Sequence, residues 1–287
     1  MHQPVLCREV IDLLRPRPGG VYVDATLGLG GHSEQIVRLG GRVVGIEWDD
    51  DAAARAAERL GPSATIVRES YANLPSILES LNLAVVDGIL IDLGVSSLQF
   101  DTASRGFSFQ REGPLDMRMS PQIPRTAKEL IQGSGERELE WIFREYGEEP
   151  RARKIAGAIV RARGETGGDI LGSTRALGDF VERLLGRHGR THPATRVFQA
   201  LRIAVNGELD NLKKFLETFD KYLGAGARCA VISFHSLEDR LVKRDFKAKA
   251  AAGGMRIVTK KPVRAEREEV LENPRSRSAK LRVIEKL

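Results

Sequence analysis

Val21-Tyr-Val-Asp-Ala-Thr-Leu-Gly-Leu-Gly-Gly-His-Ser33 is the stretch that decides the fold. A β-branched apolar run ends at Asp24, three glycines follow at positions 28, 30 and 31, and an amphipathic segment runs from Ser33 to Leu39. This order predicts a strand, a tight glycine turn and a helix, which together bring backbone N–H groups and a helix N-terminus against a nucleotide-like ligand. The alternative is a glycine loop that only connects the strand to the helix.

An acidic residue follows the next predicted strand. Arg42 to Ile46 is apolar and is followed by Glu47, nineteen residues after Gly28. A carboxylate about 20 positions beyond the glycine turn is placed to accept hydrogen bonds from a ribose diol. Ser33 stands where a dinucleotide fingerprint has its third glycine, and Asp24 would repel a pyrophosphate. The pattern favours S-adenosyl-L-methionine, whose sulfonium is cationic, over the NAD of a dehydrogenase.

Predicted strands and helices alternate up to residue 100. The expected elements are a helix at 49–60, a strand at 64–68, a helix at 72–81 and a buried strand at 88–92. Helical periods without a convincing strand fill 126–206, and strand character returns at 229–234, 256–260 and 280–285. We therefore predict an α/β fold, a doubly wound and mostly parallel sheet formed by 1–100 and 207–287, with an inserted helical domain at 101–206.

Composition places the chain among globular proteins. Of its 287 residues 41% are hydrophobic, and no apolar run approaches the ~18 residues of a membrane span. Arg8, Glu9 and Asp12 interrupt any signal-peptide core, and two cysteines are too few for a disulfide framework. We expect a cytoplasmic protein without membrane contact, with Cys229 in the core. Five histidines without ligand spacing predict no metal site.

The net charge of +6 is unevenly distributed along the chain. Residues 1–100 carry −5 and 207–239 carry −2, whereas 101–206 carry +4 and 240–287 carry +9. Such asymmetry is typical of a protein whose partner is a polyanion, because basic segments neutralise phosphates. A solvated basic surface is the alternative.

Polar residues follow the carboxyl ends of the predicted strands, where open parallel sheets bind their ligands. Asp92 ends a buried strand and opens a small polar turn that contains Gln99. An unpaired carboxylate is expensive in a core, which favours a functional role for Asp92. Tyr71 lies just beyond another strand end, where its ring either stacks on adenine or packs at the entry of a helix.

Three further strings combine basic, aromatic and polar residues. Arg105-Gly-Phe-Ser-Phe109 and Gly113-Pro-Leu-Asp-Met-Arg-Met119 suit base stacking and phosphate contact, or form a loop packed by its own phenylalanines. The predicted helix after Pro193 has an apolar face of Val197, Phe198, Leu201 and Val205 and a polar stripe of Arg196, Gln199, Arg202 and Asn206. His235 follows the strand at 229–234 and is expected to face the ligand-binding crevice at the carboxyl ends of the strands.

These strings together resemble one family. The residues that carry the resemblance are Gly28-x-Gly-Gly-His32, Asp92-Leu-Gly-Val-Ser-Ser97, the two strings at 105–109 and 113–119, His192-Pro-Ala-Thr-Arg196, Ser233-Phe-His-Ser-Leu-Glu-Asp-Arg240 and Asn273-Pro-Arg-Ser-Arg277. Seven motifs in this order resemble the bacterial small-subunit ribosomal RNA cytidine N4-methyltransferases. The resemblance implies a class I methyltransferase domain with an inserted helical substrate domain, and methylation of the exocyclic amine of a decoding-region cytidine.

The resemblance also implies residue roles. The family's cofactor positions correspond to Gly30, Gly31, His32, Glu47, Tyr71, Asp92 and Gln99. Glu47 and Tyr71 depart from the aspartate and phenylalanine common in relatives. We expect Arg118, Arg196, Arg202 and His235 to contact the substrate RNA. This RNA is either free or part of an assembled or assembling subunit.

The group that accepts a proton from the target amine is not fixed by the sequence. DNA amino-methyltransferases follow their strand-end residue with two prolines and an aromatic, whereas Leu93 and Gly94 follow Asp92 here. Asp92, Asp116 and a backbone carbonyl are therefore all candidates, and Asp92 and Asp116 are the predicted catalytic residues. We expect Asp92 to serve mainly the cofactor and Asp116 to carry more of the amine contact. Two other functions compete: an NAD-dependent dehydrogenase, and a non-catalytic RNA-binding or assembly factor.

Overall fold

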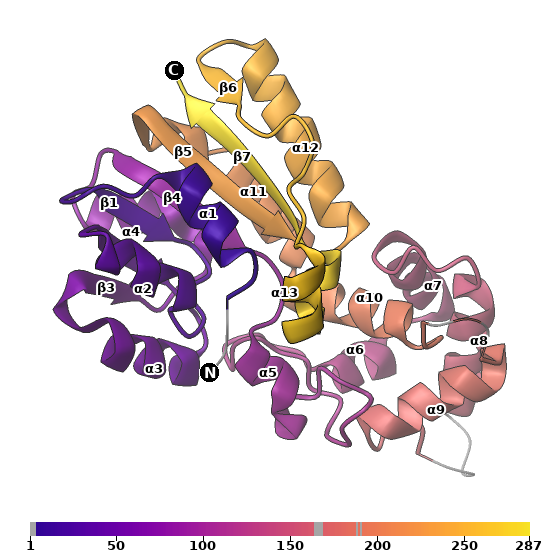
Figure 1. Cartoon of the computed structure of the whole chain (residues 1–287). Coiled ribbons are helices and arrows are strands. Elements are labelled where there is room, and N and C mark those ends of the chain that lie inside the picture. Colours follow the sequence, from indigo (N-terminus) through magenta and orange to yellow (C-terminus); the bar gives the residue numbers. More distant parts are fainter. Residues whose placement is uncertain (1–3, 164–168, 188, 190) are drawn as a thin grey trace. The chain divides into compact units, whose positions relative to one another are not determined.

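The structure is a computed structural model that describes residues 4–163, 169–187, 189 and 191–287 (Figure 1). Its helices are α1 (Cys7–Leu14), α2 (Gly31–Arg38), α3 (Asp50–Leu60), α4 (Leu74–Ser80), α5 (Ser97–Asp101), α6 (Ala127–Gly133), α7 (Glu136–Glu145), α8 (Ala152–Ala162), α9 (Thr174–Leu185), α10 (Thr195–Asn206), α11 (Glu208–Leu216), α12 (Ser236–Ala251) and α13 (Arg267–Glu272). Its strands are β1 (Val21–Asp24), β2 (Arg42–Ile46), β3 (Ala64–Val67), β4 (Val86–Asp92), β5 (Leu223–Ser233), β6 (Met255–Ile257) and β7 (Lys280–Lys286). His2 and His188, two of the five histidines considered above, lie outside the described residues.

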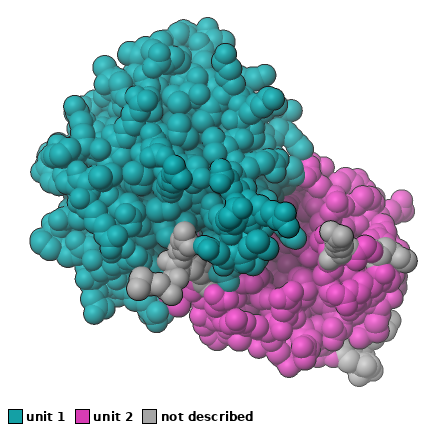
Figure 2. Space-filling model, viewed as in Figure 1, with its two compact units in different colours: residues 1–94, 209–287 teal, residues 95–208 magenta. Residues whose placement is uncertain are grey.

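The chain forms two compact units, coloured separately in Figure 2. Unit 1 comprises Met1–Gly94 and Leu209–Leu287, and unit 2 comprises Val95–Glu208. The sequence prediction placed the boundaries at 100/101 and 206/207. In the described part of unit 2 we find helices and no strand, in agreement with the helical periods of its sequence.

Unit 1 is built on one seven-stranded sheet in the order β3-β2-β1-β4-β5-β7-β6. The first five strands of that order pair in parallel, whereas β7 is antiparallel to both β5 and β6. The order reverses between β1 and β4, and ligands of open α/β sheets bind at the carboxyl ends of the strands beside such a reversal. The doubly wound, mostly parallel sheet predicted from the sequence is confirmed.

Apolar side chains cover both faces of the sheet, which explains the continuous apolar runs of the strands. Val23, Ile89 and Ile91 point to the face covered by α4, α11 and α12, with Phe215 and Phe246 in the same cluster. Neighbouring residues in the strands point to the other face, where they pack with α1 and α2. These include Tyr22, Val43, Leu90 and Ala230, which contact Val10, Leu14 and Ile36. Cys229 is fully buried, as predicted.

Most predicted elements of unit 1 match the structure to within a few residues. The strands at 21–24 and 42–46 agree, and the helix expected from Asp49 starts one residue later because Asp49 caps it, accepting from the N–H groups of Asp51 and Ala52 at 3.1 Å. The helix predicted at 72–81 is a 3₁₀ turn at Tyr71–Asn73 followed by α4. The segment expected at 229–234 is the end of a longer strand that begins at Leu223. Within the described part of the chain, no helix is long and apolar enough to cross a membrane.

Candidate active site

The glycine turn joins the carboxyl end of β1 to the N-terminus of α2. Gly28 and Gly30 have φ angles of 52° and 75°, a region that side chains with a Cβ rarely adopt. A Cβ on Gly30 would also lie 3.2 Å from the Leu60 side chain. Gly30 caps α2, so the first N–H groups of the helix, beginning at Gly31, have no partner within the helix. The turn therefore presents backbone donors at the edge of the sheet where a ligand is expected.

Ser33, the residue that replaces the third glycine, holds Asp24. The Ser33 hydroxyl donates to Asp24 Oδ2 at 2.7 Å, and the Thr26 N–H donates to Oδ1 at 3.3 Å. Both Ser33 and Asp24 are buried. Burial raises the pKa of Asp24 above its usual range. The serine is thus a partner of the carboxyl group that ends β1.

Glu47 lies directly after β2 and its carboxylate faces the same turn. Gly28 N–H donates to Oε2 at 2.8 Å, and Asp49 N–H donates to Oε1 at 2.9 Å. Each oxygen has a second lone pair, so the carboxylate can still accept from a ligand diol. Burial raises the pKa of Glu47 to about 7. Its charge therefore changes near neutral pH.

Asp92 ends β4, and His32 of α2 lies beside it. Asp92 N–H donates to the Thr26 hydroxyl at 2.6 Å, and Asp92 Oδ2 is 4.0 Å from His32 Nδ1. Asp92 Oδ1 is buried and accepts no hydrogen bond from the described residues. Burial, together with the nearby carboxylates Asp24 and Glu238, raises the pKa of Asp92 well above its usual value. A buried oxygen without a partner is costly and points to a ligand donor at this position.

His32 is held in one orientation by the N-terminal segment. Its Nε2 lies 2.9 Å from the carbonyl oxygen of Val5, so Nε2 carries the hydrogen. Burial lowers the pKa of His32, which favours the neutral ring. In that tautomer Nδ1 is an acceptor and faces Asp92.

Three carboxyl groups thus gather at the carboxyl ends of β1, β2 and β4. Within the described ranges, Asp24, Glu47 and Asp92 form no ion pair with a lysine or arginine. Such a site offers a diphosphate no cationic partner and suits a ligand with cationic groups and a diol. These features fit S-adenosyl-L-methionine: Glu47 for the ribose and the backbone from Gly30 to His32 for the amino-acid end. The unpartnered Asp92 Oδ1 is left for a donor of the cofactor or of the substrate.

Tyr71 follows β3 and is half-buried. Its ring meets that of Phe215 edge-on, with 6.0 Å between the ring centres. This contact fixes the ring at the start of the helical segment after β3, and the half-exposed ring remains a candidate to stack on adenine.

Gln99 belongs to unit 2, where it forms a capping box. Its N–H donates to the Ser96 hydroxyl at 3.2 Å, and Ser96 N–H donates to Gln99 Oε1 at 3.1 Å. The Gln99 amide also donates to the carbonyl of Met119 at 3.2 Å. These bonds give Gln99 a structural role at the start of α5, beside the cofactor role implied by the family resemblance.

The strings at 105–109 and 113–119 are bound to each other within unit 2. A Cβ on Gly106 would lie 2.1 Å from the carbonyl oxygen of Pro114, and one on Gly113 would lie 1.8 Å from that of Ala103, so only glycine fits at either position. Phe107 is buried, and the ring of Phe109 stacks on His192 at 4.5 Å. These phenylalanines therefore pack the loop, which is the second of the two interpretations of this string.

Asp116, a predicted catalytic residue, is paired with the predicted RNA contact Arg118. Arg118 Nε lies 2.8 Å from Asp116 Oδ1, and Nη2 lies 2.8 Å from Oδ2. This pairing lowers the pKa of Asp116 below its usual value, although burial acts in the opposite direction. Asp116 is thus an ionised carboxylate that already has a cationic partner.

The polar stripe predicted on α10 is wrong in one position. Asn206 is buried, not exposed: its Oδ1 accepts from Met119 N–H at 2.7 Å and its Nδ2 donates to the carbonyl of Met117 at 2.8 Å. Arg202 makes two 2.8 Å contacts with Glu208. The Arg196 side chain is half-exposed and donates to the carbonyl of Glu148 at 3.1 Å. Asn206 therefore holds the 113–119 loop to α10.

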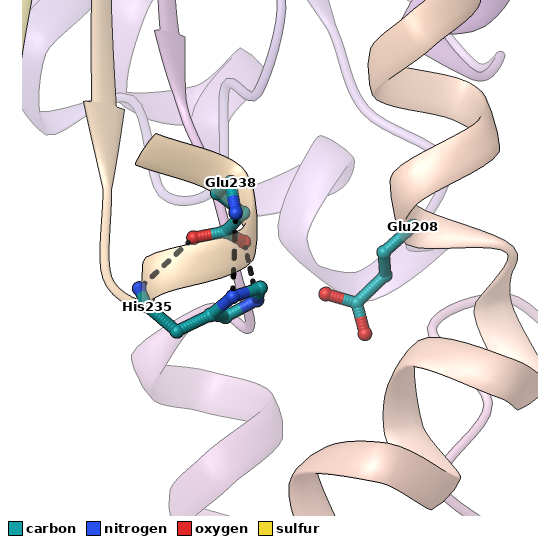
Figure 3. A group of neighbouring side chains, drawn as sticks. All are labelled: Glu208, His235 and Glu238. Atoms are coloured by element: carbon teal, nitrogen blue, oxygen red, sulfur yellow. Dashed lines mark hydrogen bonds and ion pairs between the residues drawn. The ribbon is translucent and has the colours of Figure 1, made fainter. Parts of the chain in front are cut away.

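His235 caps α12. Its Nδ1 accepts from the N–H of Glu238 at 3.5 Å, and its Nε2 lies 3.1 Å from Glu238 Oε1 (Figure 3). Glu238 also accepts from the N–H of Phe234 at 2.8 Å. Glu208, also drawn in Figure 3, is the unit 2 residue that pairs with Arg202. His235 therefore has a structural role at the start of α12 in addition to its predicted RNA contact.

The fold and the carboxyl-rich strand ends define a class I methyltransferase that uses S-adenosyl-L-methionine. All residues of the chain, 1–287, match the model of the MraW methylase family, and the chain belongs to this family. Ribosomal RNA small subunit methyltransferase H of Anaeromyxobacter dehalogenans is 46% identical, with 100% of this chain and 98% of that protein covered. The protein of the same name from Myxococcus xanthus is 48% identical, with 100% and 97% covered. The family resemblance seen in the sequence is confirmed, and the dehydrogenase alternative is wrong.

Sequence reasoning did not give roles to Thr26 and Ser33. Both lie in the string 21–33, and their hydroxyls contact the backbone of Asp92 and the carboxylate of Asp24. The available signal was a small hydroxyl residue on each side of the glycine turn, next to acidic strand ends.

Proposed function

We propose that this protein transfers a methyl group from S-adenosyl-L-methionine to the exocyclic N4 amine of a cytidine in the decoding region of small-subunit ribosomal RNA. The proposal places it in the cytoplasm, acting on RNA of an assembled or assembling subunit. Its main support is full-length similarity at 46–48% identity to proteins named Ribosomal RNA small subunit methyltransferase H. The order of the seven motifs supports the N4 position.

The site supports the proposal through the placement of its acidic groups. S-adenosyl-L-methionine supplies an electrophilic methyl group on a cationic sulfur. Glu47 and the backbone at 30–32 would hold and orient such a ligand at the carboxyl ends of β1 and β2. The hydrogen bond from Ser33 keeps the carboxyl group of Asp24 in place at the carboxyl end of β1. Orientation is the main requirement, because an amine and a methyl group held in line react far faster than free partners.

The target amine must be activated by a residue that accepts its hydrogen bond. The lone pair of this nitrogen is delocalised into the cytosine ring, and an acceptor on the N–H makes it more available. Methylation of this nitrogen would release one of its protons. The acceptor must therefore be able to take a proton at neutral pH.

Asp92 meets this requirement better than Asp116. Asp92 has a raised pKa and a buried oxygen without a partner among the described residues, so it combines basicity with an unused acceptor atom. Asp116 has both oxygens engaged by Arg118 and a lowered pKa, which makes it a weaker base. We propose Asp92 as the acceptor and Asp116 as a residue that orders the 113–119 loop.

Mass spectrometry tests the proposed reaction. Small subunits are incubated with the protein and methyl-labelled S-adenosyl-L-methionine, and the RNA is digested to nucleosides. We expect label on N4 of one cytidine in the decoding region. Label on a ring carbon or on the ribose would contradict the N4 assignment, and binding without any label would favour a non-catalytic assembly factor.

A further inference from the structure

The arginines that the sequence analysis assigned to RNA already have protein partners. Arg118 pairs with Asp116, Arg202 with Glu208, and Arg196 lies 3.9 Å from Glu149. A cation that is neutralised by its own protein contributes less to the binding of a phosphate, because the existing contact must first be given up. A polyanion binds more readily to exposed cations that are not paired with an acid.

The outer face of α12 carries exposed cations of this kind. Lys243, Arg244 and Lys247 are exposed, and within the described part of the chain none of them pairs with an acid. Arg240 is exposed on the same face, one turn earlier, although it already has a partner within the protein. Positions 240, 243, 244 and 247 have the i, i+3, i+4, i+7 spacing of one helix face. We call these four residues the α12 basic face.

The acidic residues of α12 point away from this face and have partners inside unit 1. Asp239 contacts Arg282 at 2.7 Å and Lys280 at 3.1 Å, both on β7. Asp245 lies 3.6 Å from Lys249, and the side chain of Glu238 is 2% exposed. A solvated helix face normally mixes charges of both signs. The acids of α12 stabilise the packing of the helix, and its exposed face keeps only positive charge.

The helix α12 begins at the edge of the sheet that carries the candidate active site. The helix starts directly after the carboxyl end of β5, the neighbour of β4, which ends in Asp92 (Figure 1). Val242 and Phe246 pack into the core, so the helix is fixed to the sheet. From position 240 to 247 the face extends for about 10 Å along the helix axis, at about 1.5 Å per residue. It is a rigid positive stripe that leads away from the catalytic edge of unit 1.

We propose that the α12 basic face binds the sugar-phosphate backbone of the substrate RNA next to the target cytidine. This inference rests on the proposed function and adds a backbone-binding surface to the catalytic unit. Backbone contacts fix the position of an RNA without reading its sequence. A base that must leave its stack to react needs its flanking backbone held, and a rigid helix on the catalytic sheet can do this.

Charge removal on this face is the test. The variant Lys243→Gln/Arg244→Gln/Lys247→Gln is compared with wild type in binding to purified small ribosomal subunits between about 50 and 200 mM salt. We expect affinity to fall tenfold or more at the lower salt. The slope of log K against log salt should become shallower by about 0.7–0.9 for each lost phosphate contact. Cofactor affinity by calorimetry and the melting temperature should not change.

A matched variant removes the same charge elsewhere in unit 1. Arg15→Gln/Arg55→Gln/Lys214→Gln changes exposed cations that follow α1 or lie on α3 and α11. We expect it to bind subunits with nearly the wild-type salt slope. Equal losses in both variants would mean that net charge alone attracts the RNA, and would overturn the proposal.

Two further results would also overturn it. One is an α12 variant that binds and methylates subunits as wild type does, which would leave the proposed function intact. The other is an α12 variant that loses binding to vesicles containing anionic phospholipid but not to subunits, which would assign the face to a membrane. If wild type neither binds nor methylates small subunits, the proposed function itself fails and this inference fails with it.

Discussion

Ser33 donates its hydroxyl hydrogen to Asp24 across 2.7 Å, from the first turn of α2 to the last residue of β1. Both residues are buried, so the carboxyl group depends on this partner. The contact explains why the glycine turn ends in a serine where a dinucleotide-binding turn has glycine. A third glycine lets a helix approach the sheet closely beside a pyrophosphate. Here the same position stabilises an acidic group that a pyrophosphate would not tolerate.

Removal of this hydroxyl should destabilise unit 1. We expect Ser33→Ala to lower the free energy of unfolding by about 1–3 kcal/mol, because a buried acceptor loses its donor. Chemical denaturation measures this change. Ser80→Ala is the control, since the exposed Ser80 hydroxyl donates only to the carbonyl of Ile77. Equal effects of the two substitutions would show that the Asp24 contact has no special weight.

Substitution of Glu47 should weaken cofactor binding. Glu47→Ala removes the proposed acceptor for the ribose diol, and we expect the affinity for S-adenosyl-L-methionine to fall by about 1–3 kcal/mol in calorimetric titration. Wild type should not bind NAD. Tight NAD binding, or an unchanged affinity in Glu47→Ala, would exclude the proposed arrangement.

Cofactor binding should depend on pH near neutrality. The pKa of Glu47 is about 7, and only the ionised carboxylate accepts from both hydroxyls. Affinity should therefore rise between about pH 6 and pH 8 and level off above that range. In Glu47→Gln this rise should be reduced. A rise that Glu47→Gln leaves unchanged would assign it to another group.

The same shift has the opposite effect on the free protein. Glu47 has an ordinary pKa of 4.5 and a folded pKa of about 7, so the folded state binds its proton more tightly than the unfolded state. This contribution to stability is fully present below pH 4.5 and is lost as the pH rises through 7. Cofactor binding and stability thus respond to pH in opposite directions.

The two predicted catalytic carboxylates should differ in kinetics. If Asp92 accepts the amine proton, Asp92→Asn should lower kcat by ~10²-fold or more at saturating cofactor. If it only holds the cofactor, the KM for the cofactor rises and kcat is nearly intact. Asp116→Asn should retain most of kcat while it loosens the 113–119 loop, which limited proteolysis reports. Full activity of Asp92→Asn together with an inactive, well-folded Asp116→Asn would reverse the assignment.

The two arginines of α10 should differ in their effects on stability and on RNA binding. Arg202 and Glu208 have side chains that are 18% and 8% exposed, so Arg202→Ala leaves a buried carboxylate unpaired. We expect a loss of about 1–3 kcal/mol in unfolding free energy. Arg196, half-exposed and 3.9 Å from Glu149, should change stability little when replaced by Ala. The salt slope of RNA binding should fall by less than the roughly 1 of a full phosphate contact, because Glu149 already neutralises part of the charge. If Arg202→Ala reduces RNA binding without a loss of stability, its RNA contact is direct.

The sequence predicted the sheet and the carboxyl ends of its strands because those features are local. A β-branched run that ends at an acid, followed by glycines, fixes a strand, a turn and a helix over 21–38 with little influence from distant residues. Buried parallel strands can be recognised in a sequence as continuous apolar runs, as at Ile89 to Ile91. Spacing alone placed Asp24, Glu47 and Asp92 at one edge of the sheet.

Side-chain partners depend on which distant segments meet, and the tertiary structure alone decided them. Asn206 has the helical position of a polar stripe, yet its amide binds the backbone of Met117 and Met119, nearly ninety residues earlier. Periodicity could not reveal this, because it specifies the direction of a side chain but not what covers it. The sequence also could not show which cations are paired with an acid and which are exposed. Charge counting marked the basic segments, but only the fold showed that Arg202 faces Glu208 while Lys243 and Lys247 face solvent.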